Sequence, residues 1–212
     1  MNSAITPIQQ LPGTTEGPAR ARHREDKQGS DEALMAAVMV GDLTALPRLV
    51  ERYQPRLLSM FRRMLGGDPV MAEDLVQETF LRLLQQRSFS PDRPFKPWLY
   101  TVASNLVRDY RRAEARRRLS TSEDELRSIP DQRPGPDQHA ESTAELSRII
   151  AALARLPERY RLALTLRYFD DMTVSEIADA LRIPLGTVKS RLTVGKQRLY
   201  SLLAESGGRS GM

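Results

Sequence analysis

Apolar residues recur at helical spacing in two blocks of this sequence, and a stretch rich in proline and acidic residues separates the blocks. The clearest helix spans residues 69–87, where the spacing i, i+3, i+4 and i+7 marks one buried face. That face consists of Ala72, Leu75, Val76, Thr79, Phe80, Leu83 and Leu84. No segment alternates apolar and polar residues as a half-buried strand does. The pattern predicts an all-α fold with two small helical domains.

Changes in composition give the domain boundaries. Residues 1–29 are rich in Pro, Gly and Thr and have little to bury, so we expect a disordered tail there. Helical periodicity over residues 30–118 indicates the first domain. Residues 119–141 are dominated by Ser, Asp, Glu and Pro, which is typical of a flexible acidic linker. The second domain is expected over residues 142–205, followed by a short disordered tail over residues 206–212.

Capping residues and prolines predict where helices begin and end. In the first domain, Ser30 is a suitable N-cap for the first helix. Pro47 predicts a kink or a late start of the next helix, because proline lacks the N–H that a helical bond requires. A separate helical segment is expected from Pro55 to Gly66, and a further helix over residues 95–117.

In the second domain, Ser142-x-x-Glu145 fits a capping box that would open the first helix. Pro157 is expected to start another helix, which runs to about Tyr168. Thr173-x-x-Glu176 is a second capping box and precedes a short apolar stripe.

The composition restricts the kinds of site and partner that this chain can have. The net charge of +5 and the sequence pI of about 9.8 favour polyanionic partners. The absence of cysteine excludes a disulfide scaffold and a thiolate metal site. The longest apolar run, residues 33–40, is far shorter than the roughly 20 residues of a membrane span, so we expect no membrane insertion and a cytoplasmic location. The two histidines fall in the predicted tail and linker and no catalytic motif is present, so we expect no enzyme and no cofactor.

A helix-turn-helix is predicted near the C-terminus. The short helix after Thr173 is followed by a break at 182–184 and a longer basic helix from about Pro184. Because the second helix of such a unit enters the major groove N-terminus first, its early side chains reach bases and phosphates. Those side chains are Thr187, Lys189, Ser190, Arg191 and Thr193. The alternative is an ordinary solvated basic face of a helical bundle.

Residues 157–199, and above all the string Gly-Thr-Val-Lys-Ser-Arg-Leu at 186–192, resemble the fourth region of extracytoplasmic-function (ECF) sigma factors. The resemblance implies that this helix reads the −35 promoter element. One departure stands at Val194-Gly195-Lys196, where the family usually carries an Arg-Ala-Arg-like triplet. A glycine inside a helix costs about 1 kcal/mol relative to alanine, so we expect weaker binding or a more mobile helix end.

Residues 72–83 resemble the second sigma region, which in the family binds the clamp helices of the large subunit of core RNA polymerase. A helical spacing of i, i+3, i+4 and i+7 puts the candidate polymerase contacts on one face. They are Asp74, Gln77, Glu78 and Leu81. Without the resemblance, the commoner meaning of such a face is simple solvation.

Residues 95–112 resemble the promoter-melting segment of the same region. Trp98 and Leu99 are expected in the core. The opposite face supplies an aromatic ring for stacking, an amide for base edges and cations for phosphates, as single-strand recognition requires. Its candidate −10 DNA contacts are Tyr100, Ser104, Asn105, Arg108, Arg111 and Arg112. The resemblance also implies that the loop at 88–94 helps to hold a flipped base and that the acidic linker enters a polymerase channel.

The resemblance implies a sigma factor that binds core RNA polymerase and both double- and single-stranded promoter DNA. In the family, anti-sigma factors wedge between the two domains, and the linker permits such a partner here. Two other functions stay open on the residues alone. One is a stand-alone helix-turn-helix regulator that binds duplex operators, and the other is an adaptor that sequesters polymerase.

Overall fold

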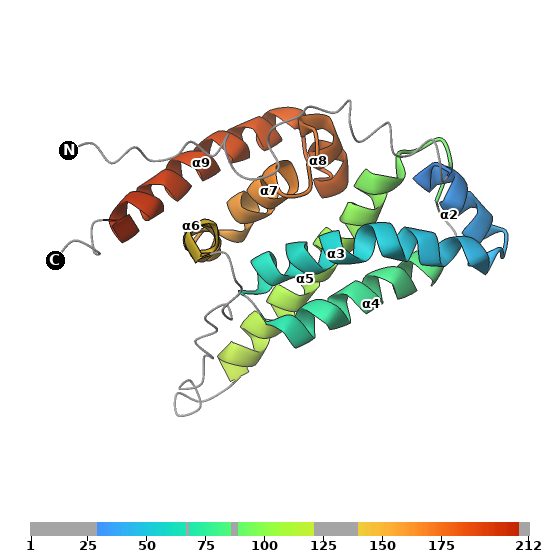
Figure 1. The fold of residues 1–212 in the computed structure, drawn as a ribbon, viewed down its shortest axis with the longest axis horizontal. Helices are drawn as coiled ribbons and strands as arrows, with labels where there is room; N and C mark the ends of the chain where they lie inside the picture. The colour runs from blue at the N-terminus through green and yellow to red at the C-terminus, as the bar shows by residue number, and fades with distance from the viewer. Residues whose placement is uncertain (1–28, 67, 86–88, 121–139, 208–212) are drawn as a thin grey trace.

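The computed structural model describes residues 29–66, 68–85, 89–120 and 140–207, which are helices and short connections with no strand among them. The all-α class is therefore confirmed. Figure 1 shows the helices of the second half of the chain lying as a layer over those of the first half. The predicted N-terminal tail up to residue 28, most of the acidic linker and the last five residues lie outside the described residues.

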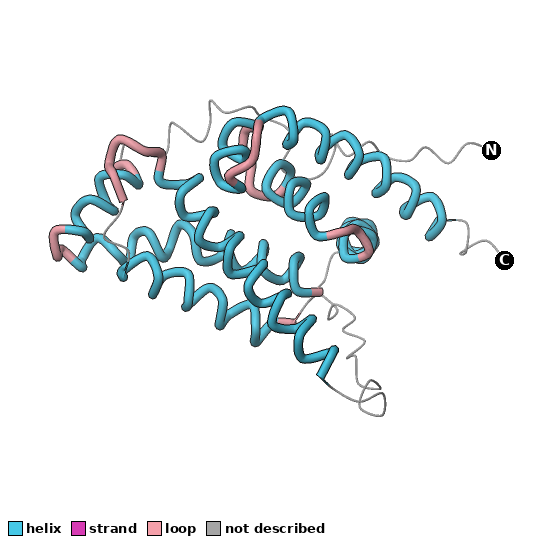
Figure 2. Tube along the Cα trace, turned by 180° about the vertical axis from the view of Figure 1, so that it is seen from behind, coloured by secondary structure: helices cyan, strands magenta, loops and turns pink. Residues whose placement is uncertain are grey.

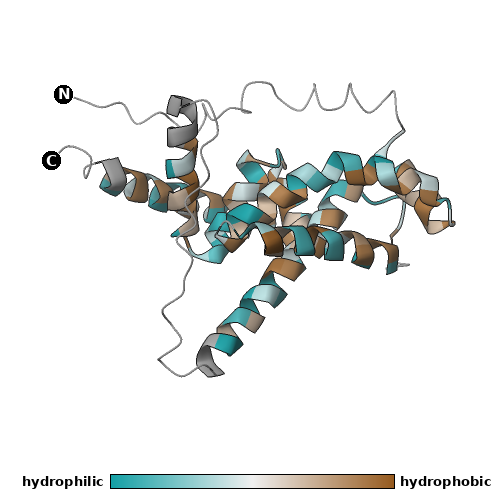
Figure 3. Cartoon of the chain, turned by 60° about the horizontal axis from the view of Figure 1, so that its bottom comes forward, coloured by the Kyte–Doolittle hydropathy of each residue, from teal (hydrophilic) through white to brown (hydrophobic). Residues whose placement is uncertain are grey.

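The first half of the chain forms a bundle around α3, α4 and α5. Its elements are α2 (Asp31–Met39), the short 3-10 helix η2 (Leu43–Ala45), α3 (Leu46–Leu65), α4 (Pro69–Gln85) and α5 (Phe95–Ser120). Leu57, Phe61 and Leu99 are fully buried between these helices. The last turns of α5 extend away from the body and are largely hydrophilic (Figure 3), which fits the arginine-rich end of this helix.

The prediction that prolines divide α3 was wrong, because Leu46–Leu65 is one continuous helix. Pro47 lies in the first turn, where its missing N–H has no intrahelical partner to lose. Pro55 lies inside the helix at an exposed position. The opposite face buries a long apolar stripe that includes Leu57 and Phe61, and this burial outweighs the roughly 3 kcal/mol cost of an internal proline.

Two N-terminal caps fix the start of the bundle. Ser30 caps α2 as predicted, because its hydroxyl accepts a 3.2 Å hydrogen bond from the Ala33 N–H. Glu32 on α2 accepts a 2.8 Å hydrogen bond from the Phe95 N–H. Since the first N–H groups of a helix have no partner within it, Glu32 ties the start of α5 to α2.

The second half contains α6 (Ala140–Ala154), α7 (Glu158–Tyr168), α8 (Val174–Leu181) and α9 (Leu185–Gly207). Pro157 precedes α7, as predicted. The Ser142 capping box was wrong, because α6 already begins at Ala140 and Ser142 lies within its first turn. Ala140 and Glu141 are good helix formers and extend the helix past the predicted cap.

The two halves of the chain share one hydrophobic core. Leu162, Leu166, Met172, Ile177 and Leu181 come from α7, α8 and the turn between them, and they pack in the same cluster as the core of the first half. A smaller cluster lies between α6, α7 and α9. The two views in Figures 1 and 2 agree that α8 lies against α5 and α7 against α3.

Candidate nucleic-acid interface

Local hydrogen bonds build the predicted helix-turn-helix from α8 and α9. The Thr173 hydroxyl accepts from the Glu176 N–H at 3.2 Å, and the Glu176 carboxylate accepts from the Thr173 N–H at 2.7 Å. The helix ends at Arg182, which adopts a left-handed conformation with φ of 53°. After this turn, the Thr187 N–H bonds to the Pro184 carbonyl at 2.9 Å and starts α9.

The first turns of α9 present polar and cationic side chains to solvent. Lys189, Ser190 and Thr193 are exposed, whereas Thr187 and Arg191 are half-buried. The Ser190 hydroxyl donates to the Thr187 carbonyl at 3.0 Å, and the Thr193 hydroxyl donates to the Lys189 carbonyl at 3.1 Å. Both hydroxyl oxygens keep lone pairs for an incoming donor. All five predicted residues therefore lie near one another on the start of this helix.

The predicted face of α4 is on the surface, with one side chain already paired. Asp74 and Gln77 are exposed, and Leu81 is 51% exposed. Glu78 is half-buried and accepts a 2.7 Å hydrogen bond from Arg82 Nε one turn later. Asp74 is thus a more accessible acid on this helix than Glu78.

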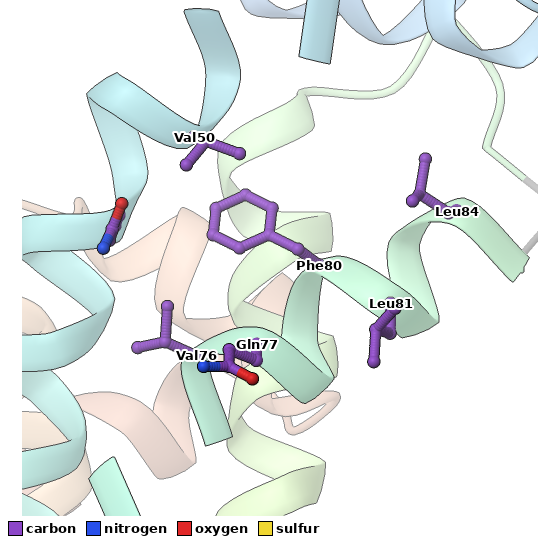
Figure 4. Close-up of a pocket in the computed structure, with 7 residues that line it drawn as sticks. Val50, Val76, Gln77, Phe80, Leu81 and Leu84 are labelled. Carbon is purple, nitrogen blue, oxygen red and sulfur yellow. The ribbon is translucent and has the colours of Figure 1, made fainter. Parts of the chain in front are cut away.

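An apolar groove lies beside this face and was not predicted from the sequence. It has a volume of about 330 Å³ and lies between α3 and α4. Figure 4 shows Val50 of α3 facing Phe80 of α4, with Leu81 and Leu84 further along α4. Leu84 was predicted to be buried but is 41% exposed. Its helical spacing put it at the edge of the buried stripe, where periodicity alone does not separate core from rim.

The predicted exposed face of α5 is largely covered. Tyr100 and Ser104 are fully buried, which contradicts their expected exposure. Asn105, Arg108 and Arg111 are half-buried, and only Arg112 is fully on the surface. The reason is that α8 packs along this face. Helical spacing put these residues on a second face of α5, but spacing alone does not show that the other half of the chain covers that face.

Tyr100 is held by Asp170, a residue that sequence reasoning missed. Its hydroxyl donates a 2.7 Å hydrogen bond to Asp170 Oδ1, and the Lys96 ammonium donates to the Asp170 carbonyl at 2.6 Å. Burial raises the pKa of Asp170 to about 6, although Tyr100, Arg63 and Lys96 oppose the shift. Burial also raises the pKa of Tyr100, and the neighbouring Asp170 adds to this effect. Asp170 lies in the α7–α8 turn, where an acidic residue is unremarkable in sequence.

Two of the predicted cations of α5, Arg108 and Arg111, are engaged by protein acceptors. Arg108 donates to Asn105 Oδ1 at 3.0 Å and lies 3.5 Å from the Leu181 carbonyl of α8. Arg111 donates to the Met64 carbonyl at 2.6 Å and pairs with Glu114 at 3.0 Å. These side chains are therefore grouped as predicted, but they are not free to contact a nucleic acid in this arrangement.

Two family models match this chain, and several curated proteins are similar to it. The models are Sigma-70 region 2, over residues 49–117, and Sigma-70 region 4, over residues 146–199. The ECF RNA polymerase sigma factor SigE of Mycolicibacterium smegmatis is 33% identical over 181 residues, which are 83% of this chain and 70% of SigE. The ECF RNA polymerase sigma-E factor of Escherichia coli K12 is 33% identical over 174 residues, which are 78% of this chain and 90% of the relative.

The chain belongs to the ECF sigma factors. It directs promoter-specific initiation of transcription by RNA polymerase. The matched segments lie in the two halves of the fold, with α3 to α5 in the first and α6 to α9 in the second.

Solved structures of similar fold include two complexes. CnrH in complex with the cytosolic domain of CnrY is 26% identical, with a TM-score of 0.63, and covers 84% of this chain and 99% of that chain. RpoE of Bartonella quintana in complex with the anti-sigma factor NepR is 24% identical, with a TM-score of 0.64, and covers 75% and 96%. The second likeness supports the fold of this sigma factor.

Gly195, part of the departure from the family pattern, has a packing role in this sigma factor. A Cβ at this position would lie 3.2 Å from Leu164 Cδ1 and 3.3 Å from Tyr160 Cβ. The missing side chain therefore lets α9 approach α7 closely. Sequence reasoning captured only the propensity cost of the glycine, since the position of α7 is a tertiary feature.

Within the described ranges, the sigma factor shows no cluster of acidic, histidine or cysteine side chains that would hold a metal ion. No helix in the same ranges is long and apolar enough to cross a membrane.

Proposed function

We propose that this sigma factor divides promoter recognition between its two halves, as regions two and four at residues 30–118 and 142–205. The start of α9 reads the −35 duplex, and the face of α5 captures the melted −10 strand. The observation that carries this proposal is the capped helix-turn-helix whose second helix exposes Lys189, Ser190 and Thr193. A basic helix start after a tight turn is the geometry that major-groove readers use.

The face of α5 supplies the parts for single-strand capture. Once α8 no longer covers this face, Tyr100 can stack on a base, Asn105 can bond to a base edge, and Arg108, Arg111 and Arg112 can bind phosphates. In this proposal Asn105 acts after the duplex has opened. Asn105→Ala should therefore reduce promoter opening more than closed-complex formation. Permanganate reactivity of promoter thymines measures opening, and a footprint identical to that of the unaltered protein would refute the assignment.

Contact with core polymerase is assigned to α4. Asp74 and Gln77 offer polar groups, while Leu81 stands beside the groove lined by Val50 and Phe80. An exposed acidic face with an apolar centre suits a basic amphipathic helix, such as the clamp helices of the large subunit. Leu81 and the groove would supply most of the binding affinity, because they would be buried in the complex. The acidic rim would fix the position of the partner helix along α4.

The sigma factor acts in this scheme without a catalytic group or cofactor of its own, in the cytoplasm where core polymerase is found. An anti-sigma factor is a further proposed partner, because RpoE of Bartonella quintana, which has a similar fold, was solved in complex with the anti-sigma factor NepR. The acidic linker is assigned to the polymerase channel, as in the family. A stand-alone regulator would instead bind duplex operators tightly without polymerase.

A further inference from the structure

A second cavity lies between α3 and the turn that joins α7 to α8, and none of the predicted DNA or polymerase contacts lines it. Its volume is about 280 Å³, which is large enough for a small molecule. Four of its lining residues come from α3 and two from the turn. They are Pro55, Arg56, Ser59, Arg63, Phe169 and Asp170. The cavity is therefore a candidate ligand site that is separate from the α4, α5 and α9 surfaces.

Two buried polar atoms of the lining residues have no hydrogen-bond partner among the described parts of the protein. Nε of Arg63 is a donor, and Oδ2 of Asp170 is an acceptor. Asp170 is 0% exposed and Arg63 is 9% exposed, so bulk solvent does not satisfy these atoms. A buried polar atom without a partner costs free energy. A ligand that enters the cavity with both an acceptor and a donor would recover this cost.

The cavity is surrounded by more cations than acids. Arg63, Lys96 and Arg56 all act on the Asp170 carboxyl through their charges, and Arg56 is exposed. No ion pair within the described ranges joins either arginine to Asp170. Burial lowers the pKa of Arg63 and of Lys96, because the protein compensates their charges only in part. A bound anion would supply the missing compensation.

The buried arginine is held in place by its neighbours. Its Nη1 donates to the Ser59 hydroxyl at 2.6 Å, and its guanidinium lies 4.1 Å from the centre of the Phe169 ring. The Ser59 hydroxyl still has its own proton to donate. The cavity thus offers a fixed guanidinium, a hydroxyl and a mobile arginine at the rim, which together suit a tetrahedral oxyanion.

Asp170 restricts which oxyanion can bind. An ionised carboxylate only accepts hydrogen bonds, so it repels an anion that has no proton to donate. Hydrogen phosphate carries one P–OH group together with oxygens that accept from arginine. Sulfate has nearly the same shape and charge but carries no proton near neutral pH. The chemistry of the cavity therefore favours hydrogen phosphate over sulfate.

We propose that this cavity binds inorganic phosphate as hydrogen phosphate, with Arg56 and Arg63 donating to its oxygens and Asp170 Oδ2 accepting from its P–OH group. The Ser59 hydroxyl donates to a further oxygen. Small rotations of the Arg56 side chain and of the Asp170 carboxyl admit the ion. The site holds or fails independently of the DNA and polymerase contacts assigned to this sigma factor, since it shares no residue with them.

Isothermal titration calorimetry on the full-length chain tests the site directly. Sodium phosphate and sodium sulfate are titrated separately at pH 7.5 and equal ionic strength, in a buffer without either ion. We expect one phosphate per chain and an affinity for sulfate that is at least about tenfold lower, because sulfate loses a charge-assisted hydrogen bond and faces the carboxylate. Equal affinities, or no saturable binding of phosphate, would overturn the proposal.

Two substitutions test the assigned roles. Arg56→Gln should weaken phosphate binding about tenfold without affecting the fold, since Arg56 is exposed. The matched control is Arg62→Gln, which changes an exposed arginine of the same helix outside the cavity. Asp170→Asn keeps an acceptor for Tyr100 and puts an N–H donor in place of Oδ2, so sulfate should then bind as tightly as phosphate. Unchanged binding in Arg56→Gln, or unchanged selectivity in Asp170→Asn, would contradict these contacts.

Phenyl phosphate distinguishes free phosphate from a phosphate monoester. With a second pKa of about 6, a monoester is almost wholly dianionic at pH 7.5 and has no proton to donate. We expect phenyl phosphate to bind at least about tenfold more weakly than inorganic phosphate to the unaltered chain. Equal or tighter binding of phenyl phosphate would overturn the assignment of the site to hydrogen phosphate.

Discussion

Individual side chains at the start of α9 carry the sequence specificity in this account. Lys189 is exposed and Arg191 is half-buried, and neither has a carboxylate partner among the ion pairs of the described residues. Lys189→Ala and Arg191→Ala should each weaken −35 duplex binding by about 1–3 kcal/mol if they contact bases. Fluorescence anisotropy on matched and scrambled duplexes measures the loss. Equal losses on both duplexes would show that these residues contact only phosphates, and Arg155→Ala is the exposed control.

The buried carboxyl of Asp170 makes the packing of α7 and α8 on the first half of the chain, here called the closed state, sensitive to pH. Its pKa is about 6 in the closed state, against an ordinary value of 3.8 when exposed. The closed state therefore binds the proton more tightly. Closure is favoured most below about pH 4, weakens as pH rises from 4 to 6, and is constant above 6. The full change is about 3 kcal/mol.

Several charged groups surround Asp170 and limit this pH effect. Arg63 and Arg56 face it from α3, and Lys96 and Tyr100 face it from α5. Lys96 also interacts with Asp171 and with Glu176 of α8. We expect the closed fraction to be larger at pH 5 than at pH 7.5, as measured by pulsed EPR between spin labels on Val70→Cys and Ser201→Cys, two exposed positions. Asp170→Asn should remove the pH dependence, and its persistence in that variant would assign the effect to another group.

Among the helices, the contact between α7 and α9 depends on Gly195. Gly195→Ala would gain about 1 kcal/mol of helix propensity but would force a methyl group against Leu164 and the Cβ of Tyr160. Neither neighbour can move freely, because Leu164 is buried and a Cβ is fixed to the backbone. We expect a net loss of about 1 kcal/mol in the free energy of unfolding, measured by denaturant titration.

Gly186→Ala is the control for this prediction. Gly186 lies in the first turn of the same helix, and a Cβ there has no atom within 4 Å. The same gain in propensity should therefore stabilise the protein or leave it unchanged. Equal stabilisation by both substitutions would contradict the close approach of α7 and α9.

The outer face of α4 and its groove are expected to act together in polymerase binding. Asp74→Lys reverses an exposed charge without breaking a pair, whereas Glu78→Lys would also lose the bond to Arg82 and place two cations together. Asp74→Lys and Leu81→Ala should each reduce core-polymerase affinity at least tenfold. Circular dichroism should show an unchanged fold. Unaltered affinity in both variants would remove the polymerase assignment from α4.

The helices themselves were largely predictable from the sequence. The capping residues Ser30 and Thr173 begin helices as predicted, because a cap acts on atoms within one turn of itself. Pro55 misled the prediction, since burial of the opposite face of α3 compensates for a missing backbone bond. The prediction that Tyr100 is exposed was also wrong. Its burial depends on α8, which lies far away in sequence, and helical spacing carries no information about such a partner.

In the whole molecule, both halves act together to direct initiation at promoters. The most direct test is transcription in vitro with core RNA polymerase on fragmented host DNA, followed by sequencing of RNA 5′ ends. We expect discrete start sites preceded by a shared two-part motif, and we expect these sites to be lost when Asp74→Lys replaces the unaltered factor. Polymerase binding without added start sites would instead indicate an adaptor. Duplex binding without polymerase binding would indicate a stand-alone regulator. Either result would contradict the joint role of the two halves in promoter-directed transcription.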